Sequence, residues 1–171
     1  GVGAAIMMAL TVALVGETGS GKTTFAKRLT VQLRVCGLEP VAIGLDDYFV
    51  DRHLTPLDED GKPDFEALEA IDLELFNEHL TKLIQGEEVE VPTFHFPTGR
   101  RQWTGTKLKV RPDQPIIIEG IHGLNDQLTV SIPKGRKFRI YVSALTNLNL
   151  DNHTRISTTD VRLLRRIIRD N

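Results

Sequence analysis

The sequence predicts an α/β fold with a mostly parallel sheet. Apolar runs with the length and composition of buried strands occur at 10–15, 40–45, 115–120 and 137–142. Between them lie stretches in which apolar residues recur at helical spacing. Alternation of strands with helices is typical of parallel sheets, because a helix returns the chain to the edge where the next strand begins. Residues 89–110 depart from this alternation and predict a projecting β-hairpin.

The first predicted strand leads directly into a glycine-rich loop, Gly16-Glu17-Thr18-Gly19-Ser20-Gly21-Lys22-Thr23. The loop matches the phosphate-binding pattern G-x-x-x-x-G-K-[ST] at every position. Its glycines let the backbone curl around an anion, and the following helix adds partial positive charge. Lys22 is then expected to reach the β- and γ-phosphates, and the Thr23 hydroxyl to ligate Mg²⁺. The predicted nucleotide-binding residues are Gly16, Thr18, Gly19, Ser20, Gly21, Lys22, Thr23 and Thr24.

Two alternatives to a phosphate loop carry less weight. One is a glycine turn that merely joins a strand to a helix, which does not explain the agreement between the full pattern and its context. The other is a dinucleotide-binding loop, which needs G-x-G-x-x-G and an acidic residue at the end of the second strand. The loop therefore predicts binding of a nucleoside triphosphate.

The helix predicted after the loop carries one apolar stripe. The stripe consists of Phe25, Ala26, Leu29, Leu33 and Cys36, and Gly37 fits a C-terminal stop. Because Cys36 falls on the stripe, its thiol is expected to be buried. It is the single cysteine of the sequence, so no internal disulfide can form, which is consistent with a reducing, cytoplasmic environment.

Acidic residues follow two of the predicted strands. Asp46 and Asp47 follow the strand at 40–45, and Glu119 ends the strand at 115–120. Both strands are expected to flank the strand of the phosphate loop, and ligands of open parallel sheets gather at the carboxyl ends of strands. Phosphoryl transfer needs a group that receives the acceptor's proton and Mg²⁺ to neutralise developing charge. Asp46 and Glu119 are the candidates for the proton acceptor and the carboxylate near the metal. The structural alternatives are that Asp46 forms a turn or caps a helix and that Glu119 is an acidic loop residue without a catalytic role.

The middle of the chain predicts a polar loop, an amphipathic helix and a hairpin. Residues 51–64 are rich in Pro, Asp and Gly, as loops are. From about Asp72, apolar residues recur at helical spacing up to Ile84. Residues 89–96 and 102–110 have strand character, but two prolines would break the ladder of a central strand. These two strands are therefore expected to project from the core.

The last segment, from about Thr158, is predicted as a helix with an apolar and a basic face. The apolar face carries Leu163, Leu164, Ile167 and Ile168, and the basic face Arg162, Arg165, Arg166 and Arg169. The arginines could close over a triphosphate, bind a polyanion such as RNA, or form a solvated face paired with Asp160 and Asp170. No strand follows to finish the sheet. Residues 1–171 are therefore expected to be one domain and a fragment of a longer chain.

Composition limits the partners. With 171 residues and 40% hydrophobic residues, the chain can form one sizeable core. A net charge of −2 gives no general attraction to nucleic acid or to anionic membranes. The apolar residues 1–15 are too few to span a bilayer. His95 and His122 lack metal-ligand spacing, so a zinc site is not expected. The other histidines, expected at the surface or in structural roles, are His53, His79 and His153.

Six motifs occur in a characteristic order. They are 16–23, 45–49 (Leu-Asp-Asp-Tyr-Phe), 63–66 (Pro-Asp-Phe-Glu), 91–96 (Val-Pro-Thr-Phe-His-Phe), 118–121 (Ile-Glu-Gly-Ile) and 160–166 (Asp-Val-Arg-Leu-Leu-Arg-Arg). Together they closely resemble the uridine kinase and phosphoribulokinase family of P-loop kinases. The resemblance implies a three-layer P-loop NTPase sandwich of the nucleoside-kinase type, with ATP and Mg²⁺, lacking here the rest of its lid and its last strand. The chain looks most like bacterial uridine kinase-like proteins fused behind a region similar to that of threonyl-tRNA synthetase, which would explain its start at Gly1.

The resemblance also implies roles for individual residues. Asp46 matches the family's catalytic base, Glu119 its acid near Mg²⁺, and Glu66 the carboxylate that holds ribose hydroxyls. The start of the lid that closes over ATP is matched by Arg162, Arg165, Arg166 and Arg169. The predicted substrate-binding residues are Asp46, Tyr48, Glu66, Phe94, His95 and Arg101.

The hairpin departs from the family pattern. Uridine-cytidine kinases have roughly Y-D-F-x-x-H in this motif, and its aromatic hydroxyl and histidine contact the pyrimidine. The corresponding positions here hold Phe94, His95 and Gly99. Without those polar contacts, discrimination between bases is poorly supported, although His95 could substitute.

The leading expectation is an ATP- and Mg²⁺-dependent kinase that phosphorylates a hydroxyl of a small molecule, with uridine or cytidine as first choice and with Lys22, Asp46 and Glu119 as catalytic residues. One alternative keeps the fold and changes the acceptor to a sugar phosphate, glycerate or pantothenate. Another is a non-catalytic ATP-binding module with a regulatory or RNA-associated role. No membrane partner is expected and nucleic acid is disfavoured. Family members commonly form dimers or tetramers, which leaves a homo-oligomer open.

Overall fold

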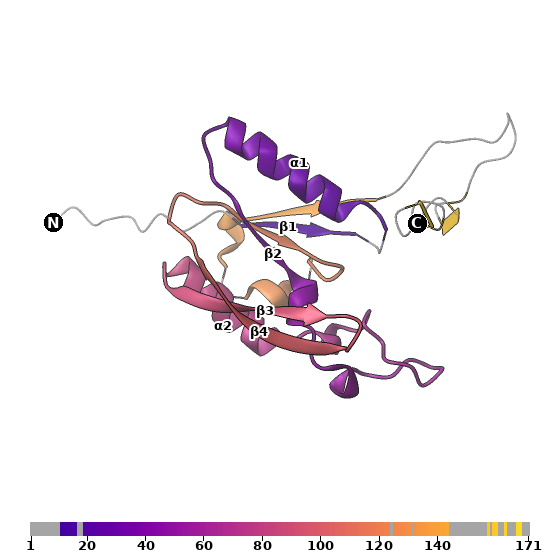
Figure 1. Cartoon of the computed structure of the whole chain (residues 1–171). Helices are drawn as coiled ribbons and strands as arrows, with labels where there is room; N and C mark the ends of the chain where they lie inside the picture. Colours follow the sequence, from indigo (N-terminus) through magenta and orange to yellow (C-terminus); the bar gives the residue numbers. More distant parts are fainter. Residues whose placement is uncertain are drawn as a thin grey trace, which may run out of the picture.

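A four-stranded parallel sheet forms the middle layer of the computed structural model (Figure 1). Its strands are β1 (Thr11–Val15), β2 (Val41–Gly44), β5 (Ile116–Glu119) and β6 (Lys137–Tyr141), in the order β2-β5-β1-β6. The structure describes residues 11–16, 19–123, 125–130 and 132–143, together with 157, 159, 160, 163, 167 and 168. The four apolar runs are all strands, and the predicted parallel α/β fold is confirmed.

The most apolar strand, β5, occupies the interior of the sheet. Ile116, Ile117 and Ile118 are fully buried, and β5 pairs with β1 on one side and with β2 on the other. A strand that is apolar on both faces belongs in the interior, where other layers cover both faces of a parallel sheet. The strand of Glu119 therefore flanks β1, as predicted. The same prediction for the strand before Asp46 is wrong, because β5 lies between β2 and β1.

The helix α1 (Lys22–Val35) covers one face of the sheet (Figure 1). Ala26 is buried in a cluster with residues of β1 and β5, and Leu29 and Leu33 pack against that cluster. The prediction of a buried Cys36 is wrong, since this cysteine is exposed. The helix ends one residue earlier, so Cys36 is its C-cap and lies beyond the packed part of the stripe.

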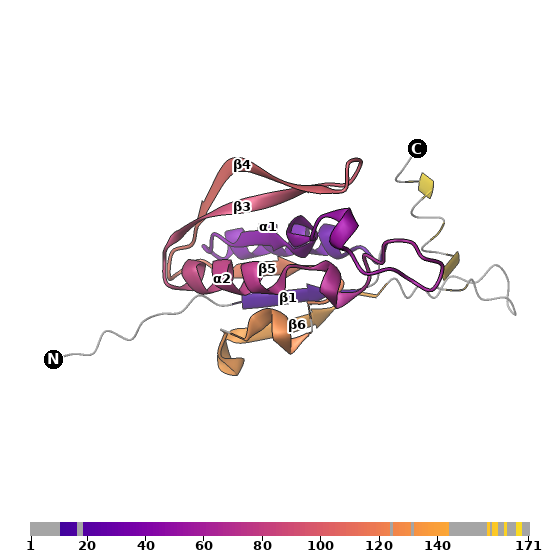
Figure 2. The same ribbon diagram turned by 90° about the horizontal axis from the view of Figure 1, so that it is seen from below.

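The helix α2 (Leu73–Ile84) lies on the opposite face, and a hairpin of β3 (Glu88–His95) and β4 (Arg100–Lys109) packs beside α2, as Figures 1 and 2 show. The Asp72 side chain caps α2 by accepting a hydrogen bond from the Leu75 N–H at 3.0 Å. The hairpin strands are antiparallel and form a sheet of their own, with a register shift near the proline of β3. The predicted projecting hairpin is confirmed.

Short 3₁₀ helices connect these layers. They are η1 (Leu45–Tyr48), η2 (Arg52–Leu54), η3 (Leu68–Ala70), η4 (Asp126–Thr129) and η5 (Lys134–Arg136). The first of them matters most for the site, because it begins directly after β2 and carries both acidic residues of the predicted pair. Its Leu45 and Tyr48 are buried, so packing against the hydrophobic core holds η1 in place.

Several residues named from the sequence lie outside the described part of the chain. They are Gly1, Glu17, Thr18, His153, Thr158, Arg162, Leu164, Arg165, Arg166, Arg169 and Asp170. Shortly before the basic segment, Ser157 Oγ accepts a hydrogen bond from the Asp160 N–H at 3.1 Å, the contact expected of a helix N-cap. Within the described ranges, no helix combines the length and the apolar character that crossing a bilayer requires.

Candidate active site

The glycine-rich loop leaves β1 at the carboxyl edge of the sheet and ends where α1 begins. Gly19 and Gly21 have φ angles of 76° and 99°, in the left-handed region that favours glycine. Gly16 has no room for a side chain, because a Cβ there would clash with the Val142 carbonyl oxygen and with Ser20 Oγ. The glycines are thus required both by backbone conformation and by close packing against the residue that follows β6.

The loop presents hydrogen-bonding groups that fit an anion. Ser20 is 5% exposed, and its Oγ has no hydrogen-bond partner among the residues that the structure describes. Gly21 is the N-cap of α1, so no side chain caps this helix and its first N–H groups need another acceptor. Phosphate oxygens satisfy both requirements. The described residues of the loop therefore fit the phosphate groups of a nucleotide.

A hydrogen bond joins the start of α1 to the end of β5. The Thr23 hydroxyl donates to Glu119 Oε1. In the described part of the chain, no group of three or more His, Cys, Asp or Glu side chains could hold a metal ion. Mg²⁺ does not need such a cage, because it commonly keeps several waters and binds one or two protein oxygens together with substrate phosphates. The Thr23 and Glu119 oxygens fit that pattern.

Asp46 lies on η1 at the same edge of the sheet, directly after β2. Burial raises the pKa of its carboxyl above the ordinary value, although the Lys22 ammonium lowers it. Smaller influences come from Glu119 and Asp47, which raise the pKa, and from His122, which lowers it. Asp46 is nevertheless exposed to solvent, so the desolvation that raises the pKa of its carboxyl is partial. The structure thus brings Asp46, Lys22 and Glu119 within electrostatic reach of one another.

The raised pKa of Asp46 predicts a stability effect. The folded protein holds the Asp46 proton more tightly than the unfolded chain does, so ionisation opposes folding as pH rises through the raised pKa. Asp46→Asn is therefore expected to increase the free energy of unfolding at pH 7, with a gain that shrinks toward pH 4. Urea unfolding at both pH values measures this. Asp60→Asn is the control, since that side chain is 79% exposed; a pH-independent gain, or the same gain in the control, would contradict the prediction.

The neighbours of Asp46 are bound to the layer beneath the sheet. Asp47 Oδ1 accepts a hydrogen bond from the Phe94 N–H at 3.3 Å. The hydroxyl of Tyr48, a residue only 1% exposed, is 3.1 Å from His79 Nδ1, and burial raises its pKa. These contacts hold η1 to β3 and to α2. A hydrogen bond from Tyr48 to substrate, as predicted from the sequence, would require its hydroxyl to give up the contact with His79.

Four phenylalanines form a cluster between the hairpin and the segment after η1. Phe94 is 4% exposed and meets Phe49, Phe65 and Phe96 edge to face, with ring centroids 5.5, 5.9 and 5.1 Å away. Phe96 is 51% exposed at the outer side of the cluster. Such edge-to-face contacts are favourable for aromatic rings. Phe94 is therefore mainly a core residue, and the ring that the cluster offers to a ligand is that of Phe96.

Arg101 connects the hairpin to the helix cap. Both terminal nitrogens of its guanidinium lie 2.9 Å from Asp72 Oδ2, and Nε donates to the Phe49 carbonyl oxygen at 3.3 Å. Its backbone N–H donates to Asp51 Oδ1 at 2.9 Å. The side chains of the ion pair are 16% and 29% exposed, so it is partly buried. Arg101 thus has a structural role here, and its predicted contact with substrate stays a prediction.

Arg101→Met is expected to lower the free energy of unfolding by about 1–3 kcal/mol, because it leaves the Asp72 carboxylate without its cation. Arg101→Lys should fall between this variant and the wild type, since Lys keeps the charge but lacks the planar fork. Denaturant unfolding measures both. Arg100→Met, at the exposed neighbouring position, is the matched control and should change stability by less than about 0.5 kcal/mol. Equal losses at the two positions would contradict a structural ion pair.

The remaining predicted substrate residues are exposed, Glu66 in a turn and His95 at the end of β3. Glu66 is exposed, and its backbone N–H donates to Asp64 Oδ1 at 2.8 Å. His95 is also exposed, with Nδ1 2.9 Å from Thr98 Oγ1. Among the described residues, no hydrogen bond joins either side chain to Asp46. Their roles in substrate binding stay predictions.

His122 is a residue near Asp46 that the sequence analysis did not assign to the site. It follows Glu119 by three positions, in the turn after β5, and its charge influences the Asp46 carboxyl. Metal-ligand spacing does not reveal this position, because Asp46, the carboxyl that His122 influences, is far away in the sequence. Its position at the carboxyl end of a buried strand is the signal that was available.

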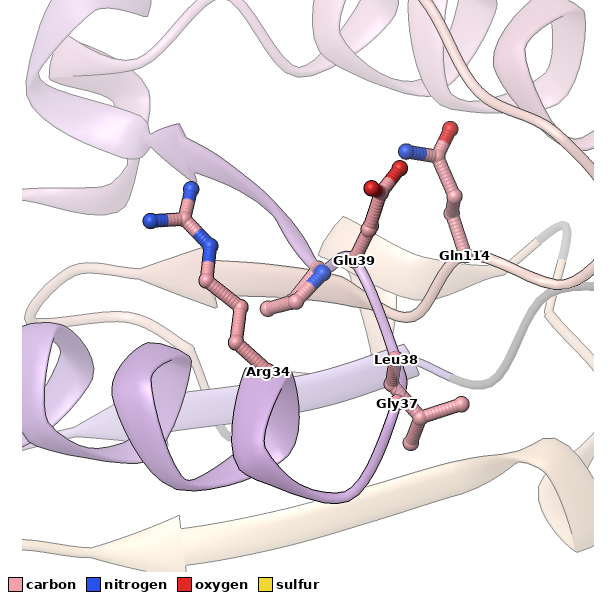
Figure 3. A pocket seen from close by; sticks show the side chains of 6 residues that line it. Arg34, Gly37, Leu38, Glu39 and Gln114 are labelled. Atoms are coloured by element: carbon pink, nitrogen blue, oxygen red, sulfur yellow. The ribbon is translucent and has the colours of Figure 1, made fainter.

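An open hollow of about 480 Å³ lies elsewhere on the molecule (Figure 3). It is lined by Arg34, Gly37, Leu38, Glu39, Pro40 and Gln114. These residues belong to the last turn of α1 and to the segments that enter β2 and β5, as Figure 3 shows for Arg34, Glu39 and Gln114. The hollow is therefore at the amino ends of the strands, opposite the glycine-rich loop, and is not part of the candidate site.

The sequence and the fold of this chain are similar to those of known proteins. A model of the phosphoribulokinase / uridine kinase family matches residues 11–171. The uridine kinase of Halobacterium salinarum is 31% identical over 160 residues, which cover 93% of this chain and 61% of that protein. The uridine kinase of Clostridium botulinum strain Kyoto is 31% identical over 162 residues, which cover 93% of this chain and 68% of that protein. The chain thus spans about two thirds of the length of these relatives.

Two solved structures share the fold. A Bacillus stearothermophilus protein provisionally named a uridine kinase has a TM-score of 0.62 and 21% identity, over 95% of this chain and 85% of that one. A protein of Silicibacter sp. TM1040, provisionally named a fructose transport system kinase, has a TM-score of 0.61 and 23% identity, over 95% of this chain and 74% of that one. At these identities the likeness concerns the arrangement of strands and helices.

Proposed function

Because the chain belongs to the phosphoribulokinase/uridine kinase family, we propose that it transfers the γ-phosphoryl group of ATP to a hydroxyl of a small molecule, with uridine or cytidine as the first candidate acceptor. One observation carries the proposal: Lys22, Asp46 and Glu119 lie within electrostatic reach of one another at the carboxyl edge of the sheet, where the glycine-rich loop passes into α1. The proposal includes a single catalytic domain and a cytoplasmic location.

Each residue has a distinct task in the proposed reaction. Asp46 receives the proton of the acceptor hydroxyl as the oxygen bonds to phosphorus. Lys22 balances the negative charge of the transferring group and, by its field, keeps Asp46 more readily ionised than burial alone would. Thr23 and Glu119 hold Mg²⁺, which neutralises charge on the phosphate oxygens. The loop N–H groups and Ser20 position the phosphates.

The hairpin supports a second candidate, a kinase with a non-nucleoside acceptor such as a sugar phosphate, glycerate or pantothenate. Phe94 is buried in the aromatic cluster and offers no hydroxyl to a base. The His95 ring is engaged with Thr98 at the hairpin tip. A site that lacks polar contacts to a base edge gains little discrimination among bases. The nucleoside remains the first choice because the relatives at 31% identity are named uridine kinases.

The experiment is an assay of ADP release by the full-length protein with ATP and Mg²⁺. Its acceptor panel comprises uridine, cytidine, adenosine, glycerate, pantothenate, fructose and ribulose 5-phosphate. We expect uridine or cytidine to raise turnover well above the rate without acceptor. Mg²⁺ removal by EDTA should abolish the stimulated rate, because charge on the transferring group is then not neutralised.

The panel separates the candidates. Stimulation by a non-nucleoside alone would replace the acceptor and leave phosphoryl transfer intact. ATP binding without stimulation by any acceptor would contradict catalysis and would favour a non-catalytic ATP-binding module. Binding of ATP is followed separately by calorimetry, so that loss of nucleotide binding is not mistaken for a wrong acceptor.

A further inference from the structure

His122 lies in the turn that follows β5, at the edge of the sheet that carries the proposed catalytic residues. The Gly120 N–H donates to the Leu14 carbonyl oxygen at 3.1 Å. A Cβ at Gly120 would lie 2.5 Å from Leu45 Cδ1, and a Cβ at Gly123 would lie 2.8 Å from the Leu14 oxygen. The two glycines on either side of His122 therefore let the turn approach β1 and η1 closely. The position of His122 beside η1 is built into the fold.

The ring of His122 has an unusual hydrogen-bonding state. Its Nε2 is shielded from solvent and has no hydrogen-bond partner among the described residues, while the residue as a whole is half-buried. Buried polar side-chain atoms in native proteins are nearly always paired, and an exception calls for a specific explanation. Thr11 Oγ1, another such atom, lies deep in β1, whereas His122 is at the catalytic edge. A ligand at this edge can supply the missing partner of His122.

The surroundings of His122 suggest which ligand that is. The ring acts electrostatically on Asp46, and so do Lys22, Glu119 and Asp47. Lys22 and Glu119 belong to the phosphate side of the site, whereas Asp46 is the proposed base for the acceptor hydroxyl. The phosphate side already has its own donors in the loop. An imidazole nitrogen can either donate to an oxygen or accept from a hydroxyl, according to its tautomer.

We propose that His122 is an acceptor-binding residue whose Nε2 forms a hydrogen bond with a second oxygen of the acceptor, next to the hydroxyl that Asp46 deprotonates. This inference rests on the proposed kinase function and adds a requirement to it. The acceptor must carry at least two oxygens near the site of transfer, as sugars, nucleosides and hydroxy acids do. A simple alcohol with one hydroxyl would leave the His122 nitrogen unpaired.

The test uses three variants of the full-length protein. His122→Gln places an amide near the former Nε2, His122→Asn places one near the former Nδ1, and His122→Leu removes hydrogen bonding altogether. The assay measures kcat and KM for uridine and for ATP. We expect KM for uridine to rise about tenfold in the Leu and Asn variants, the effect of one lost hydrogen bond, and to stay within about threefold in the Gln variant. KM for ATP should be unchanged in all three.

The outcomes are distinguishable. Unchanged KM for uridine in the Leu variant would overturn the inference, and so would a rise in KM for ATP instead. A Gln variant as impaired as the Leu variant would show that ring shape matters rather than the hydrogen bond. If the wild type prefers another acceptor of the panel, that acceptor replaces uridine in the assay. A wild type that phosphorylates none overturns the proposed function itself. Thermal unfolding identifies any variant that fails to fold, and the Asn and Gln pair then decides the test.

Discussion

Replacing Asp46 with Asn is expected to lower kcat by about 10³-fold, while the dissociation constant for ATP stays within about threefold of the wild-type value. The amide keeps the size and one oxygen of the carboxylate but cannot receive the acceptor's proton. ATP affinity should be preserved, because the proposed function assigns the phosphate contacts to the loop and to Lys22. Stopped assays of ADP release give kcat, and calorimetry gives the affinity for ATP. The variant should also be at least as stable as the wild type at pH 7, since the Asp46 charge opposes folding.

Asp47→Asn is the matched control for this prediction. Asp47 uses Oδ1 to accept the Phe94 N–H, and an Asn side chain retains that oxygen. Its effect on kcat should be less than about tenfold, because no proton transfer is assigned to it. Turnover by Asp46→Asn at the wild-type rate would remove Asp46 from its role as the base. Equal losses in both variants would indicate that the negative charge of the pair, and not one base, matters.

The second large effect is expected for Lys22→Ala. Lys22 opens α1 at the end of the glycine-rich loop and acts electrostatically on Asp46. Its loss removes a cation from the phosphates and also leaves the Asp46 carboxyl harder to ionise, because Lys22 is the main influence that lowers the pKa of Asp46. We expect kcat/KM for ATP to fall about 10³-fold or more, as for removal of a charged group that stabilises a transition state. Steady-state kinetics with varied ATP measure this.

Lys27→Ala serves as the control for Lys22, since Lys27 lies five residues further along α1, beyond its first turn, and is exposed. It should leave kcat/KM for ATP within about twofold of the wild type, because exposed charges beyond the first turn contribute little. A loss of similar size in both variants would point to general electrostatic attraction of ATP instead of a contact at the loop. Retention of full activity in Lys22→Ala would contradict the phosphate-loop assignment.

The sequence predicted the parts of the fold that local patterns determine. The β1 strand, the glycine-rich loop and α1 follow one another within 25 residues, and the motif fixes their conformation. The proline-containing hairpin was also predictable, because proline excludes a central strand. The place of β5 between β1 and β2 was not, since pairing joins segments that are distant in the chain. Cys36 was misplaced because periodicity continues one residue past the point where the helix cap ends the packing.

The same distinction applies to the site. Lys22, Asp46 and Glu119 were identifiable from local patterns: Lys22 belongs to the glycine-rich motif, Asp46 directly follows β2, and Glu119 ends β5. The interior partner of Tyr48, His79, lies 31 residues away, and the ion pair of Arg101 with Asp72 spans 29 residues. Helical and strand periodicity relates only residues that are close in the sequence, so neither of these pairs could be predicted from it. The place of His122 in the candidate site was not predicted either, because it depends on how closely the turn after β5 approaches η1 in the folded protein.

The most direct test of the account is to follow the phosphorus itself. The full-length protein is incubated with ATP, Mg²⁺ and uridine, and ³¹P NMR is recorded over the course of the reaction. The account predicts a new phosphate monoester signal that grows in step with ADP and is absent with Asp46→Asn. Release of ADP with inorganic phosphate as its sole counterpart, for uridine and for every other acceptor of the panel, would contradict the central claim that this site transfers phosphoryl groups to a hydroxyl.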